Sequence, residues 1–74
     1  MKEKYVVLVS DSLMGVHLRH YFTRYGDLRE YLNRLDGLNE KYRGEIIFYW
    51  SVYRRDFKNK KWIYMGGFDY AQTF

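Results

Sequence analysis

The chain has 74 residues, with neither cysteine nor proline, and a formal net charge of +4 from 13 Lys and Arg against 9 Asp and Glu. This length fits one domain, expected over residues 1–74, and the lack of cysteine excludes a disulfide framework and a thiolate metal site. The apolar run at residues 5–9 is too short for a secretory signal of roughly 7–15 apolar residues or a membrane helix of about 20. We therefore expect a soluble protein that is not exported.

Two strands are predicted in the first third of the chain. Residues 4–9 are continuous and β-branched, which is typical of a buried strand. Residues 16–25 alternate like a strand, but their apolar positions also fall near a 3.6-residue period. Because Val, His, Tyr, Phe and Thr favour a pleated surface, we interpret this segment as a strand that forms a hairpin with residues 5–9.

A helix is predicted over residues 27–35. Asp27 can act as its N-cap, with Glu30 three residues later as in a capping box. Gly37 is placed to end the helix in a left-handed conformation, and the polar residues 39–44 are interpreted as a loop. The apolar positions that follow the helical period are Leu28, Tyr31, Leu32 and Leu35.

The last third of the chain predicts a second hairpin. A long strand over residues 45–55 is followed by a turn at residues 57–60 and a return strand at residues 61–65. Gly66 and Gly67 are expected to break or bulge that strand, and the tail that follows to add a short edge strand or stay loose. The order β-β-α-β-β indicates an α+β domain, with an antiparallel sheet of about four strands and the helix on one face.

One helix can cover only one face of this sheet. Alternation places Ile46, Phe48, Trp50 and Val52 on the covered face, and it places Tyr49, Tyr53 and Arg55 on the other. Depending on the register, either Trp62 and Tyr64 or Ile63 and Met65 join the second face. Tyr, Trp and Arg are enriched at binding hot spots and stack on bases, whereas exposed aromatic pairs can also merely stabilise a sheet or form a homodimer face. The candidate partner-binding residues are Tyr49, Tyr53, Arg55, Trp62 and Tyr64.

A basic hairpin, residues 54–61, gives a second candidate site. It carries five positive charges and one negative charge between Tyr53 and Trp62, a pattern that suits a phosphate backbone with bases stacked beside it. The alternative is a solvated turn whose lysines protect strand edges from aggregation. The candidate nucleic-acid-binding residues are Arg54, Arg55, Lys58, Lys60 and Lys61.

No pattern for catalysis, a metal or a cofactor is found. His17 and His20 would point to opposite faces of a strand, so they cannot share a metal ion. Ser10, Asp11 and Ser12 are interpreted as a turn, because nothing places a base or an oxyanion hole beside them. The sequence therefore predicts a protein that is not an enzyme.

In general appearance the chain resembles the small accessory proteins of bacteriophages and mobile elements, including anti-CRISPR proteins and other host-takeover inhibitors. The features that carry the resemblance are the short single domain, the absence of cysteine and proline, the abundant tyrosine and the lack of a catalytic constellation. The resemblance implies inhibition by binding to a protein or nucleoprotein complex in the cytoplasm of a host cell. Many such inhibitors are acidic mimics of nucleic acid, whereas this basic chain suits an acidic protein surface or guide and target phosphates.

Overall fold

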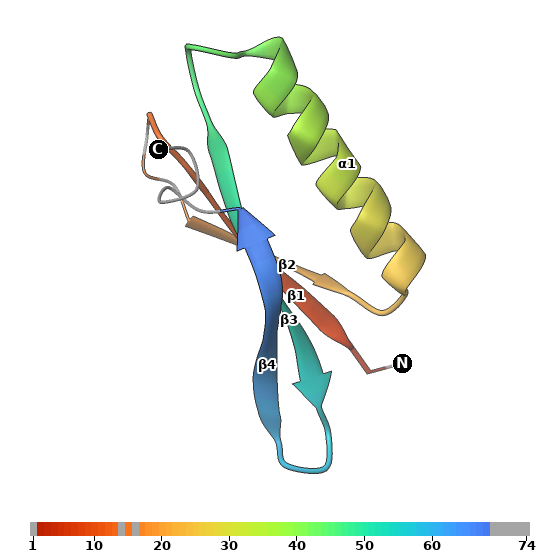
Figure 1. The fold of residues 1–74 in the computed structure, drawn as a ribbon. Helices are drawn as coiled ribbons and strands as arrows, with labels where there is room; N and C mark the ends of the chain where they lie inside the picture. Colours follow the sequence, from red (N-terminus) through yellow and green to blue (C-terminus); the bar gives the residue numbers. More distant parts are fainter. Residues whose placement is uncertain (1, 14, 16, 69–74) are drawn as a thin grey trace.

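The computed structural model describes residues 2–13, 15 and 17–68 of the chain. Within these residues the elements follow in the order β1 (Tyr5–Asp11), β2 (His17–Phe22), α1 (Tyr25–Lys41), β3 (Phe48–Asp56) and β4 (Lys61–Phe68). The strands form one antiparallel sheet in the order β2-β1-β3-β4, and α1 lies across one face of it (Figure 1). The predicted α+β fold and its element order are confirmed. The segment 16–25 is a strand rather than a helix over His17–Phe22, but Arg24 is already the N-cap and Tyr25 the first residue of α1. Residues 14 and 16 lie outside the described part.

The helix is longer at both ends than predicted. Arg24 is the N-cap and makes no side-chain cap hydrogen bond, so Asp27 lies inside the first turn and does not cap the helix. Gly37 lies inside the helix, which continues through the first half of the predicted loop at residues 39–44 and ends at Lys41. The chain turns instead beyond Lys41, with Gly44 at a φ of 85°. The one helix in the described part of the chain is not long and apolar enough to cross a membrane.

Asn39 gives a physical reason for this extension. Its side-chain Oδ1 accepts a hydrogen bond from the Phe48 N–H at 2.7 Å, and its Nδ2 donates to the Phe48 carbonyl at 3.0 Å. These two bonds attach the last turns of α1 to the start of β3. A glycine inside a helix costs only about 1 kcal/mol relative to alanine, so this anchor and the surrounding packing can outweigh the cost of Gly37.

The second hairpin also differs from the prediction at its ends. β3 begins at Phe48 rather than at residue 45, and β4 continues through Gly66 and Gly67 instead of ending before them. The register shifts between Val52 and Tyr53, so Met65 is an extra residue of β4, as in a β-bulge. The predicted tail begins at Phe68, which ends β4, and its residues 69–74 lie outside the described part.

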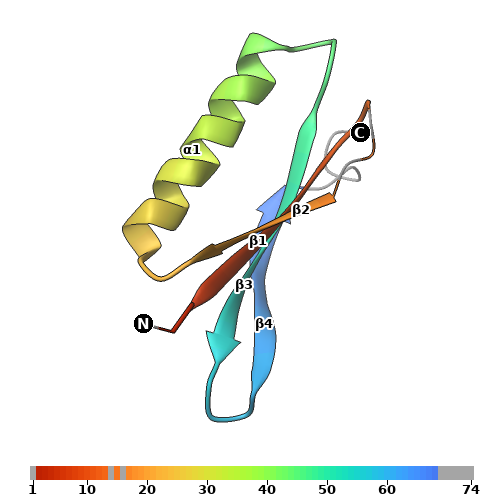
Figure 2. The ribbon, with the colours of Figure 1, turned by 180° about the vertical axis from the view of Figure 1, so that it is seen from behind.

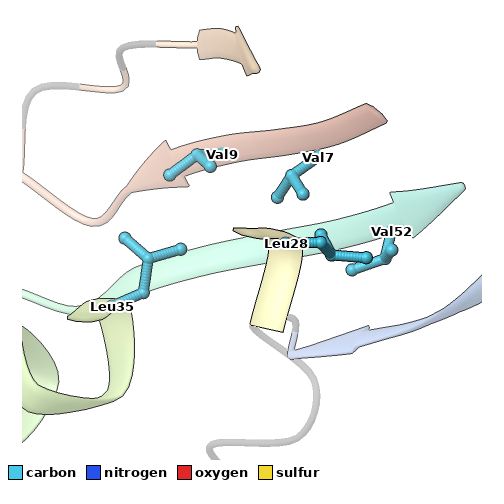
Figure 3. Close-up of a cluster of buried hydrophobic side chains, with 5 residues drawn as sticks. All are labelled: Val7, Val9, Leu28, Leu35 and Val52. Carbon is cyan, nitrogen blue, oxygen red and sulfur yellow. The ribbon is translucent and has the colours of Figure 1, made fainter. Parts of the chain in front are cut away.

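The core lies between α1 and the two central strands. Leu28 and Leu35, two turns apart on the helix, point toward the valines of β1 and β3 (Figure 3). Val7 and Leu28 are the most deeply buried side chains of this cluster. Partly buried residues surround the centre, among them Tyr31, Leu32, Phe48 and Trp50 as the helical period and the strand alternation predicted. Ile46 was also predicted on the covered face, but it precedes β3 and is not part of this cluster. The five buried residues of the cluster are Val7, Val9, Leu28, Leu35 and Val52.

Candidate binding face of the sheet

The face of the sheet opposite α1 is called the open face. Its side chains alternate along each strand with the core positions, and no helix or strand of the described residues lies over it (Figure 2). Register places Val6 between Tyr21 of β2 and Tyr53 of β3. The open-face positions are His17, Arg19 and Tyr21 in β2, and Val6, Leu8 and Ser10 in β1. They are Tyr49, Ser51, Tyr53 and Arg55 in β3, and Trp62 and Tyr64 in β4.

The structure decides which residues of β4 join this face. Tyr64 pairs with Tyr53, and Trp62 pairs with Arg55. Ile63 pairs with Arg54, so it lies on the helix side of the sheet. Of the two registers that the sequence left open, the one with Trp62 and Tyr64 beside Tyr53 is therefore present.

Aromatic rings from both edge strands meet over the centre of the open face. The ring centroids of Tyr21 and Trp62 lie 6.2 Å apart, although three strand spacings, about 14 Å, separate β2 from β4. The two side chains must therefore lean inward, over β1 and β3. Val6 beneath them is only 5% exposed, although the helix is on the other side. The open face is thus partly covered by its own rings, which the sequence analysis did not anticipate.

The rings of the open face hold each other in tilted or edge-on contacts. Tyr53 and Tyr64 form an edge-on pair with centroids 5.5 Å apart, and the Arg55 guanidinium lies 5.2 Å from the centre of the Trp62 ring. Considerable ring surface still reaches solvent, since Tyr21 is 45% exposed, Trp62 is 37% exposed and Tyr64 is 54% exposed. These side chains are oriented by one another and remain accessible to a partner.

Tyr49 differs from the other four predicted partner-binding residues. It is only 8% exposed, and its ring stacks against Phe68 with centroids 6.0 Å apart and an interplanar angle of 14°. Tyr49 therefore belongs to the packed end of the sheet and offers little surface for a partner. The cause is the continuation of β4 through its glycines, which brings Phe68 beside Tyr49. Tyr53, Arg55, Trp62 and Tyr64 lie together at the other end of the face.

The charge of the open face is positive. Arg19 and Arg55 lie on it, and none of its described strand positions is Asp or Glu. The ion pairs between described residues, Glu30–Arg34 and Glu40–Arg43, involve neither of these arginines. Arg19 and Tyr21 were not among the predicted site residues. Alternation along β2 places both on one face of the strand, but only the sheet pairing puts that face beside Tyr53.

The open face is hollowed rather than deeply cleft. One hollow of ≈ 230 Å³ lies under the rings and is lined by Val6, Leu8, Arg19, Tyr21, Tyr53 and Trp62. A second hollow, of ≈ 460 Å³, lies toward the other end of the strands and includes His17, Ser51 and Phe68 in its lining. Pockets that enclose small ligands measure about 300–1,000 Å³ and bury most of the ligand. The smaller, open hollow suits a flat group that inserts from a larger partner.

The basic hairpin does not form one surface. Arg55 lies on the open face, whereas Arg54 and Lys61 lie on the opposite side of the ribbon, and Lys58 and Lys60 are exposed in the turn. The β3–β4 hairpin projects beyond the first turn of α1, so its tip is surrounded by solvent (Figure 1). The predicted nucleic-acid-binding residues are therefore distributed over two faces and a tip.

The turn of this hairpin is organised by Asp56. Its carboxylate accepts hydrogen bonds from the N–H groups of Lys58 and Asn59 at 3.1 and 3.2 Å and from Asn59 Nδ2 at 2.8 Å. The bonds from Asn59, first its side chain and then its backbone, lower the pKa of Asp56 from the ordinary 3.8. The carboxylate is therefore occupied by the turn that presents the lysines.

The two histidines lie on opposite faces of β2, as predicted. His17 pairs with Ser10 on the open face, and His20 lies on the helix side with its ring centroid 4.8 Å from that of Tyr31. Burial raises the pKa of the Tyr31 hydroxyl above its ordinary 10.0. Across the described ranges, no three His, Cys, Asp or Glu side chains gather in a way that could hold a metal ion.

Comparison with models of protein families, with curated proteins and with solved structures finds no match for this chain. The resemblance to phage accessory inhibitors stays a hypothesis that rests on general appearance.

Proposed function

We propose that this chain is a non-catalytic binding protein that modulates or inhibits a larger macromolecular complex through the open face of its sheet. The observation that supports the proposal most strongly is the grouping of Tyr53, Arg55, Trp62 and Tyr64 on a face without carboxylates. Tyr, Trp and Arg dominate the binding energy of protein interfaces because they combine a large contact area with hydrogen-bonding groups. The partner is a protein or nucleoprotein complex.

The construction of the face supports this proposal. Its residues project from one hydrogen-bonded sheet, in which β3 is paired on both sides and β4 is paired with β3, so little order has to be gained on binding. The contact between Arg55 and Trp62 and the Tyr53–Tyr64 pair also limit the rotamers of these side chains before a partner arrives. Together with the resemblance, this supports a phage-type anti-defence or host-takeover inhibitor that acts in the cytoplasm of a host cell.

The test is a double variant, Tyr53→Ser with Tyr64→Ser, which removes both members of one ring pair. Tyr49 is left intact because it is buried, and its replacement would disturb the fold. The matched control is Tyr25→Ser with Tyr42→Ser, two tyrosines of the helix region outside the open face.

Immobilised wild-type protein and both double variants are used to capture components from a nuclease-treated cell lysate, and the captured complex is assayed with each protein. We expect the wild type and the helix control to retain and inhibit the same complex, and the Tyr53/Tyr64 variant to lose it. Equal capture and inhibition by a folded Tyr53/Tyr64 variant would contradict the proposal.

A second candidate is a nucleic-acid-binding module that uses the basic hairpin. The exposed position of Lys58 and Lys60 at a projecting tip favours it. Replacement of both lysines by Gln would then weaken binding to DNA or RNA and reduce its dependence on salt. Unchanged affinity in that variant would exclude the tip as the site.

A third candidate, a self-associating protein that buries its aromatic face in a dimer, stays a prediction. Sedimentation at several concentrations separates it from the others. A species that stays monomeric at every concentration would exclude it.

A further inference from the structure

We infer that the open face binds single-stranded nucleic acid, with bases stacked on Tyr21, Trp62 and Tyr64 and phosphates held by Arg19 and Arg55. The inference rests on the proposed function, because it uses the same face and names the chemistry of the partner. It differs from the hairpin candidate in its residues, since Arg19 and Tyr21 come from β2 at the far edge of the sheet.

The first argument is the arrangement of charge. Arg19 lies on β2 opposite Leu8 of β1, and Leu8 lies opposite Ser51 of β3. Arg55 follows Ser51 by four residues. The two arginines are therefore four residues apart along the strands and two strand spacings apart across them, which separates their backbone positions by about 17 Å. No carboxylate lies among the described strand positions of this face, so these positions place no negative charge between the two arginines. This suits an anion that extends across the sheet.

The second argument is the position of the rings. The row formed by Tyr21, Val6, Tyr53 and Tyr64 crosses the sheet between Arg19 and Arg55, and the Trp62 ring leans toward it. A ligand that reaches from one arginine to the other must therefore pass over half-exposed aromatic surface. Phosphates at the ends and flat bases between them match this order of cation, rings and cation.

The third argument distinguishes a single strand from a duplex. Bases inside a duplex are stacked on each other and offer only their edges, so they cannot stack on protein rings. The hollow of ≈ 230 Å³ beneath Tyr21 and Trp62 is open and floored by Val6, Leu8 and Tyr53, so it accepts a flat apolar surface. An unpaired base presents such a surface, and every base has one. Binding with little preference for sequence is therefore expected.

The test of charge uses fluorescence anisotropy of labelled 12-nucleotide dT and U oligomers and of a duplex of the same length. Two phosphate contacts predict a slope of log K against log salt of about −1.4, which is about a sevenfold loss of affinity between 50 and 200 mM salt. Arg19→Gln or Arg55→Gln should each reduce the slope by about 0.7. The controls Arg34→Gln and Arg43→Gln, exposed arginines outside this face, should leave it unchanged.

The test of stacking uses Trp62→Leu, which keeps an apolar side chain over Val6 while it removes the indole ring. Loss of one stacked base predicts an affinity lower by about 5- to 140-fold for both oligomers. Phe57→Leu is the matched control, because Phe57 is a similarly exposed aromatic residue of the hairpin turn. Circular dichroism and the melting temperature of each variant confirm that it is folded before its affinity is compared.

Three outcomes would overturn the inference. The first is that duplex and single strand bind equally well, that this binding is unchanged in Trp62→Leu, and that it is lost in the Lys58→Gln/Lys60→Gln variant. This result would place the site at the hairpin tip. The second is an unchanged salt slope in both open-face arginine variants. The third is no binding of either oligomer at 50 mM salt. If the oligomers do not bind but capture of a complex from nuclease-treated lysate still depends on Tyr53 and Tyr64, the proposed function is retained with a protein partner. If neither oligomer binding nor this capture is observed, both the inference and the proposed function are rejected.

Discussion

The two faces of the sheet are built from alternate residues of the same strands, yet they are closed in different ways. On the helix side, Val7 is completely covered by the packed cluster that includes Leu28 of α1. On the open side, its neighbour Val6 is almost as deeply buried, but beneath rings that reach in from the edge strands and remain partly exposed. Burial alone therefore does not distinguish the two faces. The difference is that the helix side has a cluster of buried aliphatic side chains at its centre, whereas the open side is covered by rings with accessible surface.

The two faces should contribute to different properties, the helix side to stability and the open side to binding. Aliphatic side chains contribute mainly by leaving water, so the helix-side cluster contributes to the free energy of folding. The rings and arginines of the open face keep polar and aromatic surface in contact with solvent, which a partner can still remove. Changes on the helix side should therefore reduce stability, and changes on the open side should reduce binding with little effect on stability.

The largest expected effect is that of Leu28→Ala on the helix side. Removal of a fully buried leucine should reduce the free energy of unfolding by about 2–5 kcal/mol, a large part of the stability of so small a domain. Urea unfolding followed by circular dichroism measures this change. Leu38→Ala, at an exposed position of the same helix, is the control and should lose much less. Equal losses in the two variants would contradict the placement of the core.

The second effect concerns the bulged edge of the sheet. A Cβ on Gly67 would approach the backbone carbonyl oxygen of Trp50 far more closely than real contacts allow. The strands must then separate, so Gly67→Ala should reduce stability by about 1–3 kcal/mol. Gly26→Ala is the control, because its Cβ would meet no atom within 4 Å. An unchanged unfolding midpoint for Gly67→Ala would show that β4 does not continue past its glycines.

The third comparison concerns the open face directly. The Tyr53→Ser/Tyr64→Ser variant removes a cross-strand ring pair, and such pairs contribute roughly 0.2–1 kcal/mol. We expect a loss of stability of about 1 kcal/mol or less, measured by urea unfolding, together with loss of partner binding. A loss as large as that of Leu28→Ala would mean that the open face is a second core rather than a binding face.

An effect of similar size and opposite sign is expected inside the helix. Gly37 lies within α1 and has open space where a Cβ would be, so Gly37→Ala should raise the stability by about 0.5–1 kcal/mol. The melting temperature measures this change. A decrease on substitution would favour the original prediction that the helix ends at Gly37 in a left-handed conformation.

The smallest effect is expected at the hairpin turn and depends on pH. Because the pKa of Asp56 is lowered in the folded state, its carboxylate stabilises the fold above the ordinary pKa of 3.8, and this stabilisation is lost as the pH falls through the lowered pKa. Asp56→Asn should therefore melt below the wild type at pH 7, with a difference that shrinks toward pH 3. A constant difference between these two pH values would contradict the role of the charge.

Some features of the site could be predicted from the sequence because they depend on neighbours along the chain. Alternation within residues 45–55 separates Tyr53 and Arg55 from Trp50 and Val52, and the structure confirms that division. The helical period of Leu28 and Leu35 likewise identifies the face of α1 that packs on the sheet. The ends of the elements were predicted less well, because the bonds of Asn39 to Phe48 prolong the helix beyond Gly37.

Residue type and local period are sufficient to predict the α+β order of elements, the core-facing side of the helix and the aromatic, basic character of one strand face. Three contacts become visible only once the strands are paired: Trp62 rather than Ile63 joins Tyr53, Tyr21 meets Trp62 over Val6, and Phe68 covers Tyr49. These contacts join strands that are distant in the sequence. Their register depends on a bulge at Met65 and on Gly67, which lies close against the backbone of Trp50, and no local period reveals either feature.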